Sequence, residues 1–161
     1  MRTPLLPHVP VGRLFGLVEA MAATPGPDDV YRLAERLRLR LDELQPALEA
    51  ARLLAWARVE RGDFDLTDAG LRVAAGGRAE RRALFRERAR SLPLVASILR
   101  SLAAGDRVPR EEFLEGLRAH VPPPEAERQV DTAVNWGRFA GLFDYDADDA
   151  CFLRSEEAGR R

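Results

Sequence analysis

The side chains that most often carry out catalysis are scarce in this sequence. All 25 basic residues are arginines, which excludes a lysine nucleophile, a Schiff-base lysine and the lysine of a phosphate-binding loop. The one cysteine, Cys151, could form a nucleophile–base pair with His8 or His120. Its apolar neighbours, however, indicate a buried strand thiol, and no third residue is available to orient such a pair. Two histidines and one cysteine are too few for a zinc site. We therefore expect no catalytic residue, no metal and no cofactor.

A run of aspartates near the end of the chain imitates a calcium-binding loop. The spacing Asp144-x-Asp146-x-Asp148-Asp149 matches the opening of such a loop. The loop also requires Gly at its sixth position and Glu at its twelfth, and these positions hold Asp149 and Ser155. We therefore interpret the run as an acidic hairpin turn that does not bind calcium.

The strongest basic feature is an arginine-rich stretch in the middle of the chain. It contains Arg78, Arg81, Arg82, Arg86, Arg88 and Arg90, with only Glu80 and Glu87 of opposite charge. Within it, Arg78, Arg82, Arg86 and Arg90 recur every four residues and would form one stripe along a helix. The stripe could bind an acidic surface of a partner or, less favourably, a phosphate backbone. The other interpretation is a solvated helix face, which is the usual fate of charge runs.

Aromatic and apolar residues also allow more than one interpretation. Trp56, Trp136, Phe139 and Phe143 could line a ligand pocket or stack on nucleic-acid bases. Because aromatic side chains dominate protein cores, we favour a core position for them. The apolar strip within 85–103 could form a homodimer seam, but internal burial is favoured because a coiled coil requires three or more heptads.

The elements that must position these residues are mostly helical. Apolar residues recur with helical spacing over 13–23, 30–39, 43–54, 110–119 and 124–140. Thr67 is expected to cap a further short helix that ends at Gly76. The stretch 78–104 is helical as well, and Pro93 predicts either a kink or a junction between two helices.

Alternation of apolar and polar residues predicts two short β-hairpins, over 55–66 and 142–154. Each hairpin follows a pair of predicted helices, which is the order of a winged helix. We therefore predict a mainly α fold with small β-hairpins, built from two winged-helix-like units packed through linking helices. The first unit would span 9–77, the second unit with the linking helices would form one compact body over 78–155, and 156–161 would be a flexible tail.

The charge balance argues against nucleic acid as the partner. The formal net charge is −1, with 46% hydrophobic and 32% charged residues, an ordinary globular composition. In a winged helix, the second helix of the pair enters the major groove. Here the candidate helix over 42–54 has three carboxylates and one arginine, and the helix over 124–140 is also negative. Because a DNA-binding surface must neutralise phosphates, contacts with protein are favoured.

The apolar pattern indicates neither export nor membrane insertion. Prolines and charged residues interrupt the apolar residues near the N-terminus, so we expect no signal peptide. No apolar run approaches the roughly 20 residues of a membrane span. A single cysteine cannot form an internal disulfide, which is typical of a reducing compartment. We therefore expect a cytoplasmic location.

Six short stretches of the sequence together resemble one known family. They lie at 11–17, 29–35, 50–54, 66–70, 93–95 and 132–139. The element Leu66-Thr67-x-x-Gly70 is shared with many winged helices, whereas Asn-Trp-Gly-Arg-Phe at 135–139 is more specific. From about residue 9 to 153, the chain resembles the AAA-associated C-terminal domain of nitrate/sulfonate/bicarbonate-type ABC transporter ATP-binding proteins.

The resemblance implies a regulatory or adaptor role without catalysis. The glycine-rich ATP-binding loop of those transporter proteins does not occur in these 161 residues, so we expect a copy of the domain without the ATPase domain. Its partner would be an ABC transporter ATP-binding subunit or another protein, including a second copy of the chain. It would lie in the cytoplasm, peripheral to the inner membrane through that partner, and the arginine stripe would supply charge complementarity. The alternative function is a winged-helix DNA-binding transcription regulator.

Overall fold

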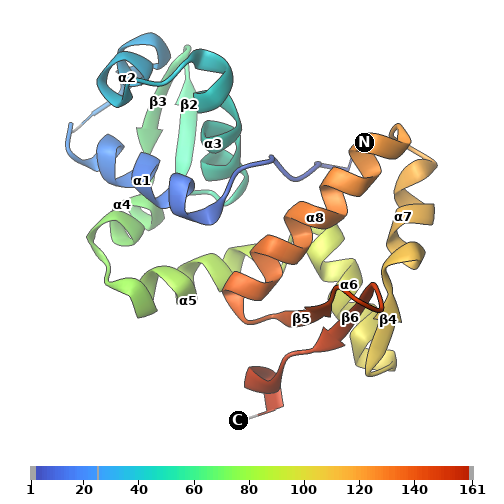
Figure 1. Ribbon diagram of the computed structural model, residues 1–161. Helices are drawn as coiled ribbons and strands as arrows, with labels where there is room; N and C mark the ends of the chain where they lie inside the picture. Colours follow the sequence, from blue (N-terminus) through green and yellow to red (C-terminus); the bar gives the residue numbers. More distant parts are fainter. Residues whose placement is uncertain (1–2, 25, 160–161) are drawn as a thin grey trace. The chain divides into compact units, whose positions relative to one another are not determined.

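The structure is a computed structural model that describes residues 3–24 and 26–159 (Figure 1). Contacts within the chain divide it into two compact units. Of the described residues, the N-terminal unit contains those within Pro7–Phe85, and the C-terminal unit contains 3–6 together with 86–159. The predicted domain boundary before Arg78 stays a prediction. Every helix in the described ranges is too short or too polar to cross a lipid bilayer.

The N-terminal unit contains four helices and a three-stranded sheet, and most of a fifth helix. Its elements are α1 (Val11–Ala22), β1 (Asp28–Asp29), α2 (Val30–Leu37), α3 (Leu41–Leu53), β2 (Ala57–Glu60), β3 (Asp63–Leu66), α4 (Asp68–Ala75) and the first part of α5 (Arg78–Ala89). The strands are antiparallel in the order β1-β3-β2, and the register sets Arg58 opposite Asp65. Arg61 and Gly62 both have positive φ, which gives the hairpin the tight two-residue turn that matches strand twist.

The C-terminal unit repeats the same order of elements. It contains the end of α5, α6 (Pro93–Ala104), β4 (Arg107–Pro109), α7 (Arg110–Arg118), α8 (Pro123–Ala140), β5 (Phe143–Asp146), β6 (Cys151–Arg154) and the 3-10 helix η1 (Glu156–Gly159). Its sheet is antiparallel in the order β4-β6-β5. In both units the sequence helix, strand, helix, helix, strand, strand therefore builds one sheet in which the last strand is central.

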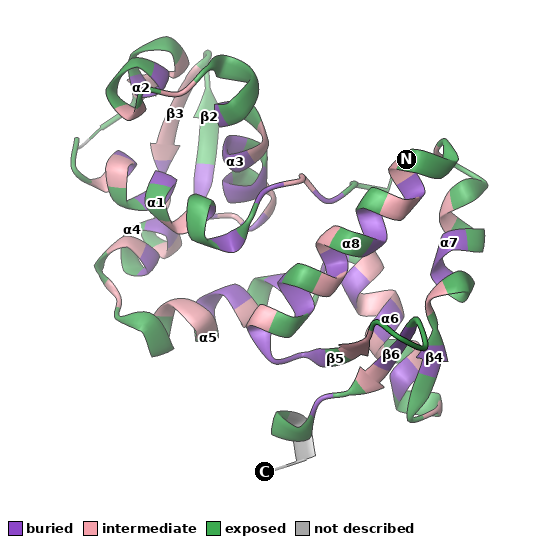
Figure 2. Ribbon diagram, in the orientation of Figure 1, coloured by how far each residue is buried: buried purple, intermediate pink, exposed green. Residues whose placement is uncertain are grey.

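Each unit has its own aromatic core. In the N-terminal unit, the fully buried Trp56 lies with its ring centroid 5.9 Å from that of Phe15 and 6.0 Å from that of Phe85. In the C-terminal unit, Phe152 contacts Phe113 and Phe143 edge to face, with centroids 5.3 Å apart in both pairs. Figure 2 shows the buried residues of α3 and α8 along one side of each helix, which leaves the opposite side exposed.

A buried polar contact fixes Leu6 to α8 in the C-terminal unit. Gln129 in α8 is 1% exposed, and its side chain accepts a hydrogen bond from the Leu6 backbone N–H (2.7 Å) and donates one to the Leu6 carbonyl (2.9 Å). Burying an amide side chain without such partners would be unfavourable. No sequence pattern predicted this role for Gln129.

The structure confirms a mainly α fold with small β-hairpins. The predicted hairpins match β2–β3 and β5–β6, and two helices, α5 and α6, meet at the predicted junction, with Pro93 at the start of α6. The short strands β1 and β4 were not predicted. Residues 156–159, predicted as part of a flexible tail, form a 3-10 helix where Ser155 Oγ accepts from the Glu157 N–H (3.2 Å), and 160–161 lie outside the described residues. That linking helices pack the two units together stays a prediction.

Candidate functional site

The arginine stripe does not belong to one unit. Arg78 and Arg82 fall in the N-terminal unit, and Arg86 and Arg90 fall in the C-terminal unit. Arg78 and Arg90 are exposed and Arg82 and Arg86 are half-buried, and Arg90 lies just beyond the end of α5. Their role in partner binding stays a prediction.

One arginine of the same stretch has a structural role that the spacing did not reveal. The guanidinium of Arg81 donates to the carbonyls of Val73 and Ala74, both at 2.8 Å. These are carbonyls of the last turn of α4, which have no partner within the helix. Arg81 also pairs with Glu19 and lies 5.8 Å over the ring of Phe15. It therefore holds α4 to α1 inside the N-terminal unit.

The exposed surface formed by α3 and the β2–β3 hairpin is negatively charged. Helix α3 contributes three carboxylates and one arginine, and the hairpin contributes three carboxylates and two arginines. Asp42, Glu43 and Glu49 are all exposed. This surface, which a DNA-binding winged helix would place against phosphates, has the wrong sign for that contact.

The corresponding surface of α8 and the β5–β6 hairpin is also negatively charged. Helix α8 carries three carboxylates and two arginines, and residues 143–154 carry four aspartates and one arginine. Two of the α8 carboxylates, Glu127 and Asp131, bind Arg110 at the start of α7, with Nη2 2.7 and 2.9 Å from their oxygens. The Arg110 side chain is 14% exposed, so this cluster holds α7 against α8.

The predicted calcium-like run is used within its own hairpin. Asp146 Oδ1 accepts hydrogen bonds from the backbone N–H groups of Asp148 (3.0 Å) and Asp149 (3.2 Å), and Arg107 pairs with both Asp146 and Asp149. The Asp149 N–H lowers the pKa of Asp146 below its usual value. Partial desolvation opposes this shift, while the Asp148 N–H and Arg107 add to it. Among the described residues, no three His, Cys, Asp or Glu side chains are placed to hold a metal ion.

We expect the β5–β6 turn to lose stability in acid because the folded-state pKa of Asp146 is depressed. The stabilisation is present above the pKa of the unfolded chain and is lost as the pH falls through the lower folded-state pKa. NMR titration of the Asp148 and Asp149 amides should follow this transition. Asp146→Ala should remove it, whereas Asp144→Asn, at an exposed neighbouring carboxylate, should not. Unchanged amide shifts in the Asp146→Ala protein would show that the side chain does not organise the turn.

Cys151 lies in a structural position. It is 9% exposed, and its thiol contacts the carbonyl of Asp149 (3.3 Å) within the same turn. His120 is exposed just beyond α7, and His8 belongs to the other unit. The aromatic residues Trp56, Trp136 and Phe143 are fully buried core residues, as expected. Phe139, for which a core position was also predicted, is only half-buried.

In each unit, one of the two motifs that resemble the family, Leu66–Gly70 or Asn135–Phe139, forms a close contact between a helix and its hairpin, here called a helix–hairpin joint. Thr67 accepts at Oγ1 from the Gly70 N–H (3.2 Å) and donates to the Ala55 carbonyl (2.7 Å), so it both caps α4 and holds the start of the hairpin. In the C-terminal unit, Gly137 of α8 lies directly against the ring of Phe143 in β5. Both motifs therefore fix a helix to a strand.

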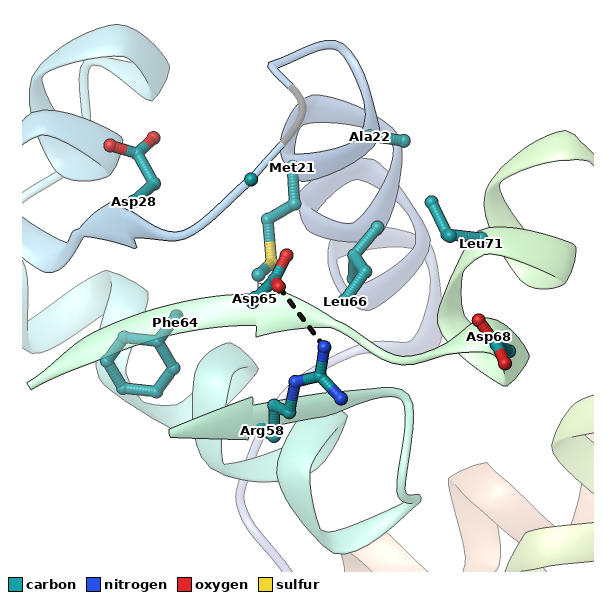
Figure 3. A pocket seen from close by; sticks show the side chains of 10 residues that line it. Met21, Ala22, Asp28, Arg58, Phe64, Asp65, Leu66, Asp68 and Leu71 are labelled. Carbon is teal, nitrogen blue, oxygen red and sulfur yellow. Dashed lines mark hydrogen bonds and ion pairs between the residues drawn. The ribbon is translucent and has the colours of Figure 1, made fainter. Parts of the chain in front are cut away.

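A pocket of about 310 Å³ opens in the N-terminal unit. It lies where the end of α1, the sheet and the start of α4 meet, and Figure 3 shows Asp28 and Asp68 on opposite sides of Met21, Asp65 and Leu66. Its lining consists of Met21, Ala22, Gly26, Asp28, Arg58, Phe64, Asp65, Leu66, Asp68 and Leu71. No sequence pattern marks this pocket, because its residues come from segments that only the folded chain brings together.

One solved structure similar to the chain is that of N,N-8-amino-8-demethyl-D-riboflavin dimethyltransferase from Streptomyces davawensis. The two share 23% identity over 80% of this chain, with a TM-score of 0.35. The chain spans about 40% of the length of that protein, and at this TM-score we infer neither fold nor activity from the likeness. No curated protein matches the chain.

A family match covers most of the chain. The family is described as the C-terminal AAA-associated domain, and the matched residues are 31–146. This stretch begins in α2 and ends with β5, so it includes the helix pairs of both units and both family-like joints. The chain therefore belongs to the family of C-terminal AAA-associated domains.

Proposed function

We propose that this chain is a non-enzymatic regulatory or adaptor domain that binds a protein. The proposed partner is the ATP-binding subunit of a nitrate/sulfonate/bicarbonate-type ABC transporter, which would hold the domain in the cytoplasm at the inner membrane. Membership of the AAA-associated family supports an association with transporter-like proteins. The resemblance stated above for the sequence motifs supports the transporter type.

The observation that carries the proposal is the charge of the two helix–hairpin surfaces. In both units the order of elements is that of a winged helix, and in both the surface available for docking has more carboxylates than arginines. Such surfaces are attracted to basic protein surfaces and repelled by phosphates. The arginines at the two ends of α5 would bind acidic groups of the same partner.

We expect charge reversal at the two exposed stripe residues to weaken partner recovery. In a tagged pull-down from native lysate with solubilised membranes, the intact chain should recover an ABC ATP-binding subunit, identified by mass spectrometry, with and without nuclease. The double variant Arg78→Glu, Arg90→Glu should reduce recovery about tenfold, since each reversal replaces an attraction with a repulsion. Arg13→Glu, an exposed change on α1, is the matched control. Equal recovery by both variants would remove the stripe from the interface.

The second candidate function is a winged-helix transcription regulator, which the order of elements favours. It would give a different result in the same experiment, because discrete DNA fragments would be recovered and then lost on nuclease treatment. Affinity for a duplex should then fall by orders of magnitude between low and physiological salt, because phosphate contacts release counterions. Sequence preference at physiological salt would distinguish such a regulator from nonspecific binding.

A further inference from the structure

The pocket of the N-terminal unit has the composition of a binding site for a small amphipathic molecule. Its volume, about 310 Å³, lies at the lower end of the range for small-molecule sites. Met21, Phe64 and Leu66 supply an apolar wall, and Leu71 at the pocket is 49% exposed. A large aliphatic side chain left in water beside a concave surface gains free energy when a ligand covers it.

The charges around this apolar wall are predominantly negative. Asp28, Asp65 and Asp68 line the pocket together with one cation, Arg58. Arg58 Nη2 lies 3.4 Å from Asp65 Oδ2, and Arg36, which is outside the lining, lies 3.0 Å from Asp28 Oδ2. Within the described part of the chain, Asp68 makes no ion pair. Even with Arg36 included, the pocket keeps an excess of negative charge.

The distribution of the carboxylates distinguishes between possible cations. Asp28 comes from β1, Asp65 from β3 and Asp68 from α4, and Figure 3 shows them apart from one another along the pocket. No three such groups in the described ranges converge closely enough to hold a metal ion. Separated negative charges with an apolar surface between them fit a chain of methylene groups that carries positive charge at intervals.

We propose that this pocket binds an elongated organic cation of the alkyl polyamine class. The methylene groups would contact Met21, Leu66 and Leu71. The ammonium groups would lie near the three carboxylates of the pocket, Asp28, Asp65 and Asp68. This inference does not depend on the identity of the protein partner, since every residue involved lies within the N-terminal unit.

The test is an NMR titration of the full ¹⁵N-labelled chain with spermidine. We expect saturable shifts of the amides of 21–24, 26, 28, 64–66 and 68–71. Mg²⁺ at the same ionic strength should not reproduce these shifts, because screening by salt acts on all exposed charges and not on the pocket alone. The neutral 1,5-pentanediol should not saturate, because it has the methylene chain without the charge.

Two variants and one control make the result specific to the pocket. Asp68→Asn should weaken spermidine binding about fivefold, the loss expected for one solvent-accessible ion pair. Asp65→Asn alone should weaken spermidine binding more than Asp68→Asn does, because the positive charge of Arg58 then has no carboxylate partner in the pocket. Asp144→Asn, an exposed carboxylate of the other unit, should bind like the unaltered chain. Circular dichroism verifies that each variant is folded.

The proposal is overturned by any of three results. These are spermidine shifts that do not saturate, shifts that Mg²⁺ reproduces at the same residues, and equal affinities of the folded Asp68→Asn and Asp144→Asn proteins. A failure here would leave the proposed protein partner untouched, and a failure of the pull-down would leave the pocket untouched.

Discussion

Replacing Gly70 with alanine should destabilise the N-terminal unit by about 3 kcal/mol, the upper end of the usual cost of overpacking. A Cβ at this buried position would lie 2.0 Å from the backbone carbonyl oxygen of Trp56. That oxygen already accepts a hydrogen bond from the Thr67 N–H (2.9 Å), so it cannot move away without breaking the joint between α4 and the hairpin. Urea unfolding, monitored through hydrogen exchange of the amides in the N-terminal unit, would measure the loss of stability.

The matched control for this substitution is Gly16→Ala. Gly16 is also in a helix, but it is exposed and a Cβ there would meet nothing within 4 Å. Alanine should therefore stabilise α1 by about 0.5–1 kcal/mol through its higher helix propensity. If Gly70→Ala were as stable as Gly16→Ala, the close approach of α4 to Trp56 would be disproved.

Gly137→Ala should have a comparable effect on the C-terminal unit. Its Cβ would lie 2.0–2.6 Å from three ring atoms of Phe143, which is fully buried. We expect a loss of about 2–3 kcal/mol, somewhat less than for a clash with backbone. Hydrogen exchange should show the change in the amides of α8 and β5 before those of the N-terminal unit.

A double-mutant cycle identifies the opposing side chain. Phe143→Leu alone should destabilise the unit by leaving a cavity, but in the Gly137→Ala background it should cost less, because the smaller side chain relieves the clash. Gly116→Ala, on the exposed side of α7 with nothing within 4 Å of the added carbon, controls for the change in helix propensity. Additive effects of the two substitutions would contradict the contact.

These two glycines give the motifs that resemble the family a packing role. Gly70 closes Leu-Thr-x-x-Gly, and Gly137 is the centre of Asn-Trp-Gly-Arg-Phe. Gly70 lets α4 approach the Trp56 backbone, which leads into β2, and Gly137 lets α8 approach the Phe143 ring of β5. A residue with a Cβ would not allow either approach. Short motifs of this kind identify a fold, and function must come from the surfaces that the fold exposes.

Helix periodicity and local capping made most of the elements predictable. Thr67 and Gly76 are the N-cap and C-cap of α4, as expected, because both act through contacts within a few residues. The exact caps were less predictable. Two adjacent aspartates precede α2, and it is Asp29 whose side chain accepts from the Tyr31 and Arg32 N–H groups; the N-cap of α7 is Pro109, which makes no side-chain cap.

The sites were less predictable than the elements because they depend on contacts distant in sequence. Strands β1 and β4 have two and three residues and form by pairing with β3 and β6, so no local alternation marks them. The polar role of Arg81 depends on carbonyls of another helix. The pocket combines residues from 21 to 71, and no spacing rule relates them.

Because Leu6 hydrogen-bonds to Gln129, the C-terminal unit can complete its folding only after the N-terminal unit has been synthesised. In topological terms, the N-terminal unit is an insertion within the C-terminal one, since the chain leaves that unit after Leu6 and re-enters it at Arg86. On the ribosome, Leu6 emerges long before Gln129, so the segment must wait while the inserted unit is synthesised. A fragment that begins at Arg86 would lack the two backbone groups that satisfy the Gln129 amide, and the two units are therefore not separable by cutting the chain once.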